Sequence, residues 1–430
     1  MRSIKIAWKS LWERKLATLF IMLQLVISFY LISNGFIQLS IPDYASETIK
    51  KYSNLALEKT LTFSVPDLTS DNTWSIERYL KLRKEVSGMN EVSNYGSFST
   101  AYFILSDLKN SDLYEAKNQV LYKNSPLRGK EKLSYMVYFD ESIFSSSKIK
   151  ILKGRSLAKQ DFAAEHHEQI PVLVGQDYEG IFDIGDTFSI YWFGEKLNYR
   201  VVGVMDRESK WLDKNDYISM GVRDLNAAIV TPFLDYQKNS SPFVISSLQK
   251  STFVSVQDTD DRKILSEKIK QAATQLGLPS PIVRSIKEEL DAYKKSKIEL
   301  VKLNLYAGVF FLLTTSIGII TSTLSSIRIR FYEFGIRRVF GESIISIARS
   351  IIIEVFLLIL LSACFGVFWN YYNSATSIIA DMSSVKDLFG IALFAKVIIL
   401  VLLLTFLSVL YPIRVLYRES PYKLISGVEN

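Results

Sequence analysis

The residues whose types and spacing suit them to chemistry are concentrated in one short segment, RIRFYEFGIRRVFGESI, at residues 328–344. Residues three or four apart are neighbours on a helix, so Arg330 and Arg337 can both form ion pairs with Glu333, and Arg338 can pair with Glu342. Apolar residues with the same spacing predict one stripe on a single helix: Ile329, Tyr332, Ile336, Phe340, Ile344 and Ile347. Paired charges beside an apolar stripe indicate binding, either to lipid headgroups or to a soluble partner.

Two glycines interrupt this segment, and one carboxylate follows it. Gly335 and Gly341 each cost a helix about 1 kcal/mol relative to alanine, so they either permit close packing or mark a bend. Glu354 lies about one turn inside the next apolar stretch, where an ionisable group is a candidate functional residue. Its closeness to the interface favours a structural or coupling role over substrate contact, with Arg328 or Arg349 as the expected partner.

The histidines, the single cysteine and the glycine-rich positions do not indicate a further functional site. His166 and His167 are adjacent and cannot share one face of a strand or helix, so we predict no metal site. Cys364 lies inside an apolar stretch and is expected to pack there. A P-loop needs G-x-x-x-x-G-K-[ST], and the only Gly-Lys pair, at 129–130, is followed by glutamate. We therefore expect this chain to bind no cofactor and no nucleotide.

Apolar stretches define the organisation of the 430-residue chain. A helix needs about 20 apolar residues to cross a bilayer. Four stretches meet this need, the last with snorkelling ends, and we predict spans at 16–41, 303–327, 350–373 and 389–413. The first is too long for a signal peptide and lacks a small-residue cleavage site, so we expect an uncleaved anchor.

Charge predicts the orientation, because Lys and Arg near spans stay in the cytoplasm. Basic residues gather in an amphipathic N-terminal segment (1–15), in the segment 328–349 and in the tail 414–430. Both termini are then inside, and the block 42–302 and the short loop 374–388 are outside. Residues 41–302 hold 36 basic and 36 acidic residues, so the net charge of +7 belongs to the membrane part. It therefore does not indicate nucleic-acid binding.

The outer block reads as mixed α/β. Amphipathic helices are predicted at 73–86 and 258–277, and a hairpin turn at 194–196. Ser285 and Glu288 have capping-box spacing at the start of a helix, 285–302, that can continue into the second span. Aromatic residues at 95–103 are expected in the core. β-Branched and aromatic runs predict strands at 60–65, 135–139, 170–175, 187–194, 197–205 and 251–256. The predicted fold class is a membrane protein with four transmembrane α-helices and a large mixed α/β extracytoplasmic domain between helices 1 and 2.

The charged segment RFYEFGIRRVFGESIISIARSIIIE resembles the cytoplasmic segment of FtsX-like permeases, the MacB-type class of ABC transporter subunits. Their pattern is close to R-x-x-E-x-G-I-R-R-A-x-G with a glutamate in the next span, and Val339 replaces its alanine. The tail YPIRVLYRESPYKLI is similar to the family's ending, and LKGRSLAKQDF to its G-R-x-hydrophobic…D stretch. The matching positions are Arg330, Glu333, Gly335, Ile336, Arg337, Arg338, Gly341 and Glu354, with Pro412, Arg414 and Pro421 in the tail.

The resemblance implies a mechanotransmitter that docks through residues 328–349 on a separate ABC ATPase, which binds ATP and Mg²⁺. It further implies a homodimer of this chain with an ATPase dimer, contact with membrane lipid, and an adaptor of the membrane-fusion type as a further candidate partner. The expected role is export or extraction of a peptide, toxin, antibiotic or lipid-like substrate at the outer face of the cytoplasmic membrane. The alternatives are an FtsX-like regulator of cell-wall hydrolases and a lipoprotein-releasing permease. The Lys/Ile/Tyr-rich composition and the absence of exported cysteine suggest a Gram-positive host.

Overall fold

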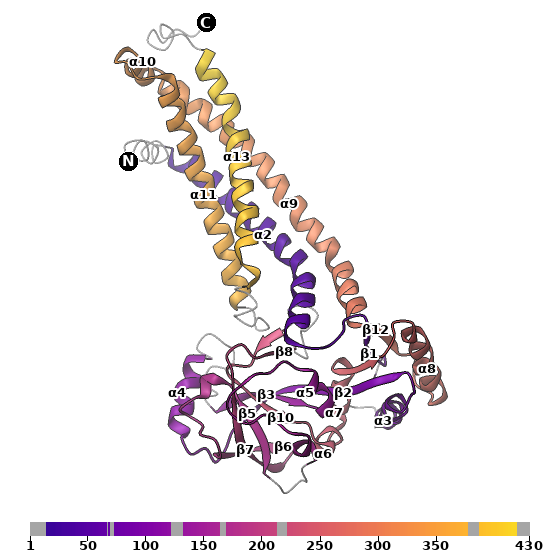
Figure 1. The fold of residues 1–430 in the computed structure, drawn as a ribbon. Coiled ribbons are helices and arrows are strands. Elements are labelled where there is room, and N and C mark those ends of the chain that lie inside the picture. The colour runs from indigo at the N-terminus through magenta and orange to yellow at the C-terminus, as the bar shows by residue number, and fades with distance from the viewer. Residues whose placement is uncertain are drawn as a thin grey trace. The chain divides into compact units, whose positions relative to one another are not determined.

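The computed structural model describes residues 14–66, 68, 73–121, 132–163, 169–212, 222–376 and 387–418. Its contacts divide the chain into two compact units (Figure 1). One unit comprises Met1–Ser40, Lys297–Ser377 and Val385–Asn430, and the other comprises Ile41–Ser296 and Ile378–Ser384. The first contains the apolar helices and the second contains the sheet, so we refer to them as the helical unit and the α/β domain.

Four helices are long and apolar enough to cross a membrane: α2 (Lys15–Tyr52), α9 (Ile286–Ile329), α11 (Ile344–Thr376) and α13 (Ile391–Arg418). The α/β domain lies between α2 and α9 in the sequence, which confirms the predicted fold class. At 1.5 Å per residue, the 44 residues of α9 extend over about 66 Å. Helices of this length exceed the hydrocarbon thickness, so α2 and α9 each have a part that belongs to the α/β domain.

The predicted capping box at the start of α9 is present. The Ser285 N–H donates to Glu288 Oε2 (2.8 Å), and the Glu288 N–H donates to Ser285 Oγ (3.1 Å). Two backbone N–H groups at the start of the helix, which would otherwise lack partners, are thereby satisfied. From this cap the helix runs without interruption to Ile329, as the absence of proline in this stretch had allowed.

The α/β domain contains twelve strands and several short helices among the described residues. The strands are β1 (Thr60–Ser64), β2 (Val92–Ile104), β3 (Leu133–Phe139), β4 (Ile151–Gly154), β5 (Ile170–Val174), β6 (Thr187–Trp192), β7 (Glu195–Met205), β8 (Lys210–Leu212), β9 (Val222–Asp224), β10 (Ala228–Pro232), β11 (Thr252–Val256) and β12 (Ile282–Ser285). The α-helices are α3 (Thr73–Ser87), α4 (Ser111–Leu121), α5 (Glu141–Ser146), α6 (Asp235–Lys238), α7 (Pro242–Ser247) and α8 (Asp261–Gln275).

One large mixed sheet organises this domain, in the order β12-β1-β11-β2-β3-β10-β5-β7-β4, with β6 also paired to β7. The pairs β3/β10 and β5/β7 are parallel, and the other pairs in this sheet are antiparallel. Strand β3 is buried along its whole length because both faces of the sheet are covered. Its alternate residues Tyr135, Val137 and Phe139 face one core cluster, while Met136 and Tyr138 face another, as the two-residue period of a strand requires.

The C-terminal end of α2 and the N-terminal end of α9 are part of this domain's core. Ala45 and Ile49 of α2 and Ile286 and Leu290 of α9 are buried in the cluster that also contains Phe139. A third cluster packs α3 and α8 against β1 and β11. The two long helices are thus fixed to the sheet by close packing, so a displacement of either helix would be felt by the sheet.

Sequence prediction placed the turn of the β6–β7 hairpin one residue too late. Trp192 pairs with Glu195, so the turn residues are Phe193 and Gly194, both with positive φ (47° and 95°). Two adjacent residues in this conformation match the tight hairpin turn whose twist suits paired strands.

Candidate functional site

The charged segment is not one helix, so the predicted continuous stripe was wrong. A separate helix, α10 (Phe331–Val339), lies between α9 and α11 in the sequence. Arg330 is its N-cap residue and Phe340 its C-cap residue. Gly341 follows with φ +86°, a conformation that favours glycine and turns the chain before α11 begins. Of the two roles left open for the glycines, Gly341 marks a bend, whereas Gly335 is buried and packed.

The buried face of α10 rests on a small apolar cluster. Phe334 is only 2% exposed and contacts a group built from Ile347, Ile351 and Leu416, which belong to α11 and α13. Burial of a phenylalanine side chain contributes about 1.5–3 kcal/mol, so this contact fixes α10 on the end of the helical unit.

The other apolar residues of the segment are exposed. Tyr332 is 63% exposed, Val339 69% and Phe340 86%, and Ile329 and Ile336 are exposed as well. Arg337 and Arg338, in the last turn of α10, lie beside them. We call the exposed group Ile329, Tyr332, Ile336, Val339 and Phe340, with these two arginines, the α10 surface. Large apolar side chains that gather on a surface in this way mark an interaction site.

Glu333 connects Arg330, just before α10, with Arg337 in its last turn. Arg330 Nε donates to Glu333 Oε2 (3.0 Å), and Arg337 Nη2 pairs with Glu333 Oε1. Burial alone would raise the pKa of Glu333, but hydrogen bonding and the charges of Arg330 and Arg337 outweigh it and lower that pKa below its ordinary value. Glu342 pairs with Arg337 (3.9 Å) instead of the expected Arg338, because the bend at Gly341 removes the helical spacing.

Glu354 of α11 is buried (7% exposed) and lies between two arginines from other elements. Arg14, beside the start of α2, places Nη2 2.6 Å from Glu354 Oε1, and Arg330 Nη1 is 3.7 Å from Oε2. Arg14 Nη1 also donates to the backbone carbonyl of Ser322 and to its Oγ (3.1 Å), which adds α9 to the cluster. The expected partners Arg328 and Arg349 are exposed and do not fill this role.

Arg14 is the functional candidate that sequence reasoning missed. It is 340 positions from Glu354, so no local spacing connects the two residues. The available signal was depth: Arg14 is next to the start of one apolar stretch, and Glu354 is about a turn inside another. Two opposite charges at the same depth of a bilayer are expected to pair.

The remaining predicted residues are scattered. Pro412 is buried in α13 and Arg414 is exposed two residues later, whereas Pro421 lies outside the described residues. His166 and His167 also lie outside them. Within the part of the chain that the structure describes, no group of three or more metal-ligating side chains occurs. Cys364 is exposed on α11.

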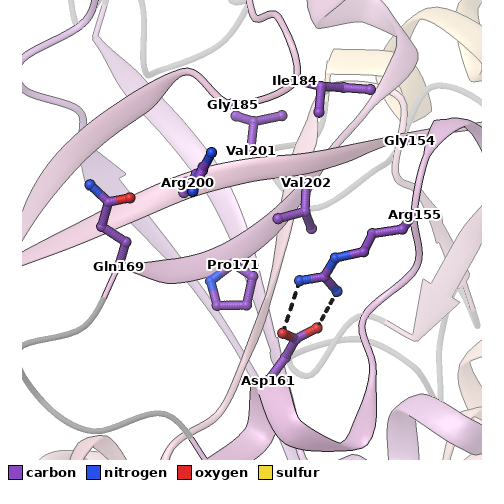
Figure 2. Close-up of a pocket in the computed structure, with 10 residues that line it drawn as sticks. All are labelled: Gly154, Arg155, Asp161, Gln169, Pro171, Ile184, Gly185, Arg200, Val201 and Val202. Atoms are coloured by element: carbon purple, nitrogen blue, oxygen red, sulfur yellow. Dashed lines mark hydrogen bonds and ion pairs between the residues drawn. The ribbon is translucent and has the colours of Figure 1, made fainter.

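The G-R…D stretch of the α/β domain forms a clasp beside a surface groove (Figure 2). Arg155 holds Asp161 through two parallel hydrogen bonds of 2.5 and 3.0 Å, and the Ala158 N–H donates to the same carboxylate (2.7 Å). Hydrogen bonding to Asp161 raises the pKa of Arg155. The groove, of about 580 Å³, is also lined by Gln169 and Arg200. The clasp closes the loop that follows β4, so the arginine and aspartate of the G-R…D stretch have a structural role.

Replacing the buried carboxylate of the clasp is expected to destabilise the α/β domain. Asp161→Ala removes three charge-assisted hydrogen bonds, two of them from Arg155, and should lower the free energy of unfolding by about 2 kcal/mol. Denaturant unfolding of the full chain in detergent would measure this. Asp183→Ala, which removes a carboxylate that is 76% exposed, is the control and should change it by less than about 1 kcal/mol. Equal effects of the two variants would contradict a structural role for the clasp.

Two family profiles match the chain. The "MacB-like periplasmic core domain" matches residues 56–272, which is more than half of the chain, and the "FtsX-like permease C-terminal" matches residues 305–421. The first match coincides with the α/β domain, and the second includes α10, Glu354 and the end of α13.

Solved structures similar to the chain include two from proteins of this kind. One is the extracellular domain of the noncanonic ABC-type transporter YknZ from Gram-positive bacteria, with 11% identity over 53% of this chain and 98% of that chain (TM-score 0.32). The other is the periplasmic region of MacB from Actinobacillus actinomycetemcomitans, with 13% identity over 59% of this chain and 96% of that chain (TM-score 0.32). No curated protein matches the sequence significantly.

Permeases of this type are membrane subunits of ABC transporters and are not themselves ATPases. The four apolar helices make this chain a multi-pass membrane protein, in keeping with such a role. With both halves of its sequence matched, the chain belongs to the MacB/FtsX-like family of ABC-transporter permeases.

Proposed function

We propose that this chain pairs with a separate ABC ATPase and transmits the work of ATP hydrolysis across the cytoplasmic membrane to a substrate outside. The observation that carries the proposal is the α10 surface, which presents exposed aromatic and aliphatic side chains beside two arginines. Aromatic and arginine residues are the ones enriched at protein–protein contacts, so this surface suits a protein partner better than lipid headgroups alone.

Transmission requires a path from α10 to the other side of the membrane. Helices α2 and α9 provide it, because each is continuous through a predicted span and ends in the core of the α/β domain. A close-packed core resists deformation, so an axial shift or rotation of either helix would be passed to the sheet. The chain therefore acts as a mechanotransmitter in this proposal, with two copies working with an ATPase dimer that binds ATP and Mg²⁺.

The proposed cargo is a peptide, toxin, antibiotic or lipid-like compound, extracted or exported at the outer face of the membrane. An adaptor of the membrane-fusion type is a further proposed partner. The two alternatives, activation of cell-wall hydrolases and release of lipoproteins, use the same mechanics. The large α/β domain favours transport over hydrolase activation, since FtsX-like regulators typically carry a smaller outer domain.

The proposal needs α10 in the cytoplasm and the α/β domain outside, which cysteine labelling tests. In a Cys364→Ser background, Asn198→Cys on β7 is expected to react with a membrane-impermeant maleimide in intact cells, because Asn198 is exposed. Val339→Cys on α10 should react only after the membrane is permeabilised, because lysine- and arginine-rich segments are retained inside.

The two cysteines are matched, since both replace exposed residues of regular elements, and each serves as the control for the other. Labelling of Val339→Cys in intact cells would place α10 outside. The docking of a cytoplasmic ATPase on α10, and the whole proposed function, would then be wrong.

A further inference from the structure

Five charged side chains of the helical unit form one alternating series. Its members, in spatial order, are Arg337, Glu333, Arg330, Glu354 and Arg14. Each positive group contacts the negative group next to it: the Glu333–Arg330, Arg330–Glu354 and Glu354–Arg14 distances are 3.0, 3.7 and 2.6 Å. The series begins at the α10 surface and ends at the start of α2.

Its inner end is better shielded than its outer end. The side chains of Glu354 and Arg330 are 9% and 13% exposed, against 43% for Glu333. Charges are less screened where water is excluded, so the inner pairs are the stronger ones. A buried carboxylate between two guanidinium groups also cannot lose one partner without leaving net charge in a poorly solvated place.

Arg14 is held from two directions. One nitrogen of its guanidinium group pairs with Glu354 of α11, and the other donates to the carbonyl and hydroxyl of Ser322 in α9. A planar group with several donors in fixed directions makes both contacts at once more readily than a lysine ammonium on a flexible stem. The residue type at position 14 therefore fits a positioning role.

Chain connectivity explains why α2 needs such a link. Helix α10 is joined directly to α9 and, through the bend at Gly341, to α11, so it moves them through the backbone. Along the backbone, helix α2 is joined to α9 only through the whole α/β domain, and its direct contact with α9 includes apolar packing such as that of Ile32 on Gly308. Other polar contacts of α2, such as Gln24 with Thr315 and Ser33 with Asn370, reach α9 and α11 but do not involve the charged side chains of α10.

We infer that Arg14 is a positioning residue that carries the displacement of α10 into α2 through Glu354 and Arg330. The inference rests on the proposed function, because it needs an ATPase that moves α10. With the link intact, α2 follows α10 and takes the α/β domain with it through Ala45 and Ile49. Without the link, the displacement of α10 reaches α2 only through the packing of α2 on α9 and α11, so the push on the two helices becomes unequal.

The test follows α2 and α9 separately. Ser40 on α2 and Ser296 on α9 lie at the boundaries between the two units, and each hydroxyl donates to a carbonyl three residues earlier. In a Cys364→Ser background, a single cysteine at either position carries an environment-sensitive fluorophore. The purified complex with the ATPase is then compared with and without ATP and Mg²⁺.

Arg14→Gln is expected to leave the amount of copurified ATPase unchanged and to reduce the ATP-dependent signal at position 40 by about tenfold, within the usual range of coupling between sites. The signal at position 296 should persist. Arg14→Lys should restore part of the signal at position 40. Arg349→Gln, which removes an exposed arginine near the same end of α11, should change neither signal.

Each outcome bears on the inference. An unchanged signal at position 40 in Arg14→Gln, or an equal loss at both positions, would overturn it. If Arg14→Gln fails to accumulate, Arg14→Lys alone decides the matter through the ratio of the two signals. If the unmodified chain does not copurify with an ATPase, or shows no ATP-dependent signal at either position, the proposed function fails. If copurification or both signals are lost in the Arg14 variants but not in the unmodified chain, the result counts against the role of Arg14 and not against the proposed function.

Discussion

Reversing the charge of Arg337 is expected to abolish copurification of this chain with the proposed ATPase partner while leaving the chain in the membrane. Arg337 lies in the last turn of α10 beside the exposed Tyr332 and Phe340. A reversed charge within a docked surface typically costs about 2–5 kcal/mol of binding free energy, which weakens the complex at least about 30-fold. Pull-down of the ATPase through a tag on this chain would measure the effect.

The variant's effect on α10 itself is small by comparison. Arg337→Glu places two carboxylates four residues apart, at 333 and 337, which costs a helix only a few tenths of a kcal/mol. The contact of Phe334 with α11 and α13 is untouched, so α10 should stay in place. Glu333→Lys, which reverses the charge on the partner of the same pair, should weaken binding similarly.

Arg349→Glu provides the matched control for charge reversal. Arg349 is exposed near the start of α11 and lies outside the α10 surface. We expect this control to bind the ATPase normally, and membrane fractionation should show all three variants at wild-type levels. Normal copurification of both α10 variants would rule out α10 as the docking element.

The apolar spans and the fully buried strands could be predicted because their signals are local. The run 135–139 is apolar at every position, since alternate residues of β3 face two different cores. Four long apolar stretches gave the four membrane helices directly. In each case the apolar pattern is complete within the element's own sequence and can be read without knowing its distant neighbours.

Strand β2 was missed because its sequence argues against a strand. Its 13 residues begin with VSNYGSFST, in which Asn94 and Gly96 have low strand propensity and three serines interrupt the β-branched and aromatic pattern. The structure supplies the reason for Gly96: a Cβ there would collide with Ser142 Oγ and approach Ile143 within 2.7 Å, so α5 packs directly on the strand. A packing partner 46 positions away leaves no trace in local periodicity. The four aromatics at 95–103 likewise divide, with Phe98 in the core and Tyr102 exposed.

The candidate site was predicted by residue type but not by arrangement. The pairs of Glu333 with Arg330 and Arg337 follow from helical spacing, and both are present. The apolar stripe failed because it assumed one helix, whereas the left-handed Gly341 starts a new one. Within α10 itself, the buried side chain is Phe334, which was not in the stripe, and Tyr332 and Phe340, which were, are exposed. Spacing rules hold only within an unbroken helix.

The partners of Glu354 show most clearly that contacts between helices cannot be predicted from sequence proximity. Sequence proximity suggested Arg328 and Arg349, but the structure gives Arg14 and Arg330. Nearness along the chain was a poor guide because side chains of one helix that are five residues apart point in different directions. A contact between the first span and the third depends on how the helices pack, which a single sequence does not encode locally.

Removing the charge of Glu354 is expected to destabilise the helical unit more than any other single substitution proposed for it. Glu354→Gln leaves Arg14 and Arg330 close together with no carboxylate between them, and breaking a buried ion pair typically costs about 3–5 kcal/mol. The level of the chain in membranes and its thermal unfolding in detergent should both fall. Glu342→Gln, which removes a half-buried carboxylate of the same segment with an arginine at 3.9 Å, should cost about 1 kcal/mol or less.

A double-mutant cycle separates the ion pair from a general effect of position 354. In Arg14→Gln/Glu354→Gln both partners are neutral amides, so the second substitution should recover part of the loss caused by the first. Interaction free energies between contacting residues are commonly about 0.5–3 kcal/mol, and Arg14 and Glu354, at 2.6 Å, should fall in that range. Strictly additive losses would mean that Arg14 and Glu354 do not interact energetically. In that case the stabilising effect of Glu354 would not come from its pair with Arg14, and this pair would not couple α2 to α10.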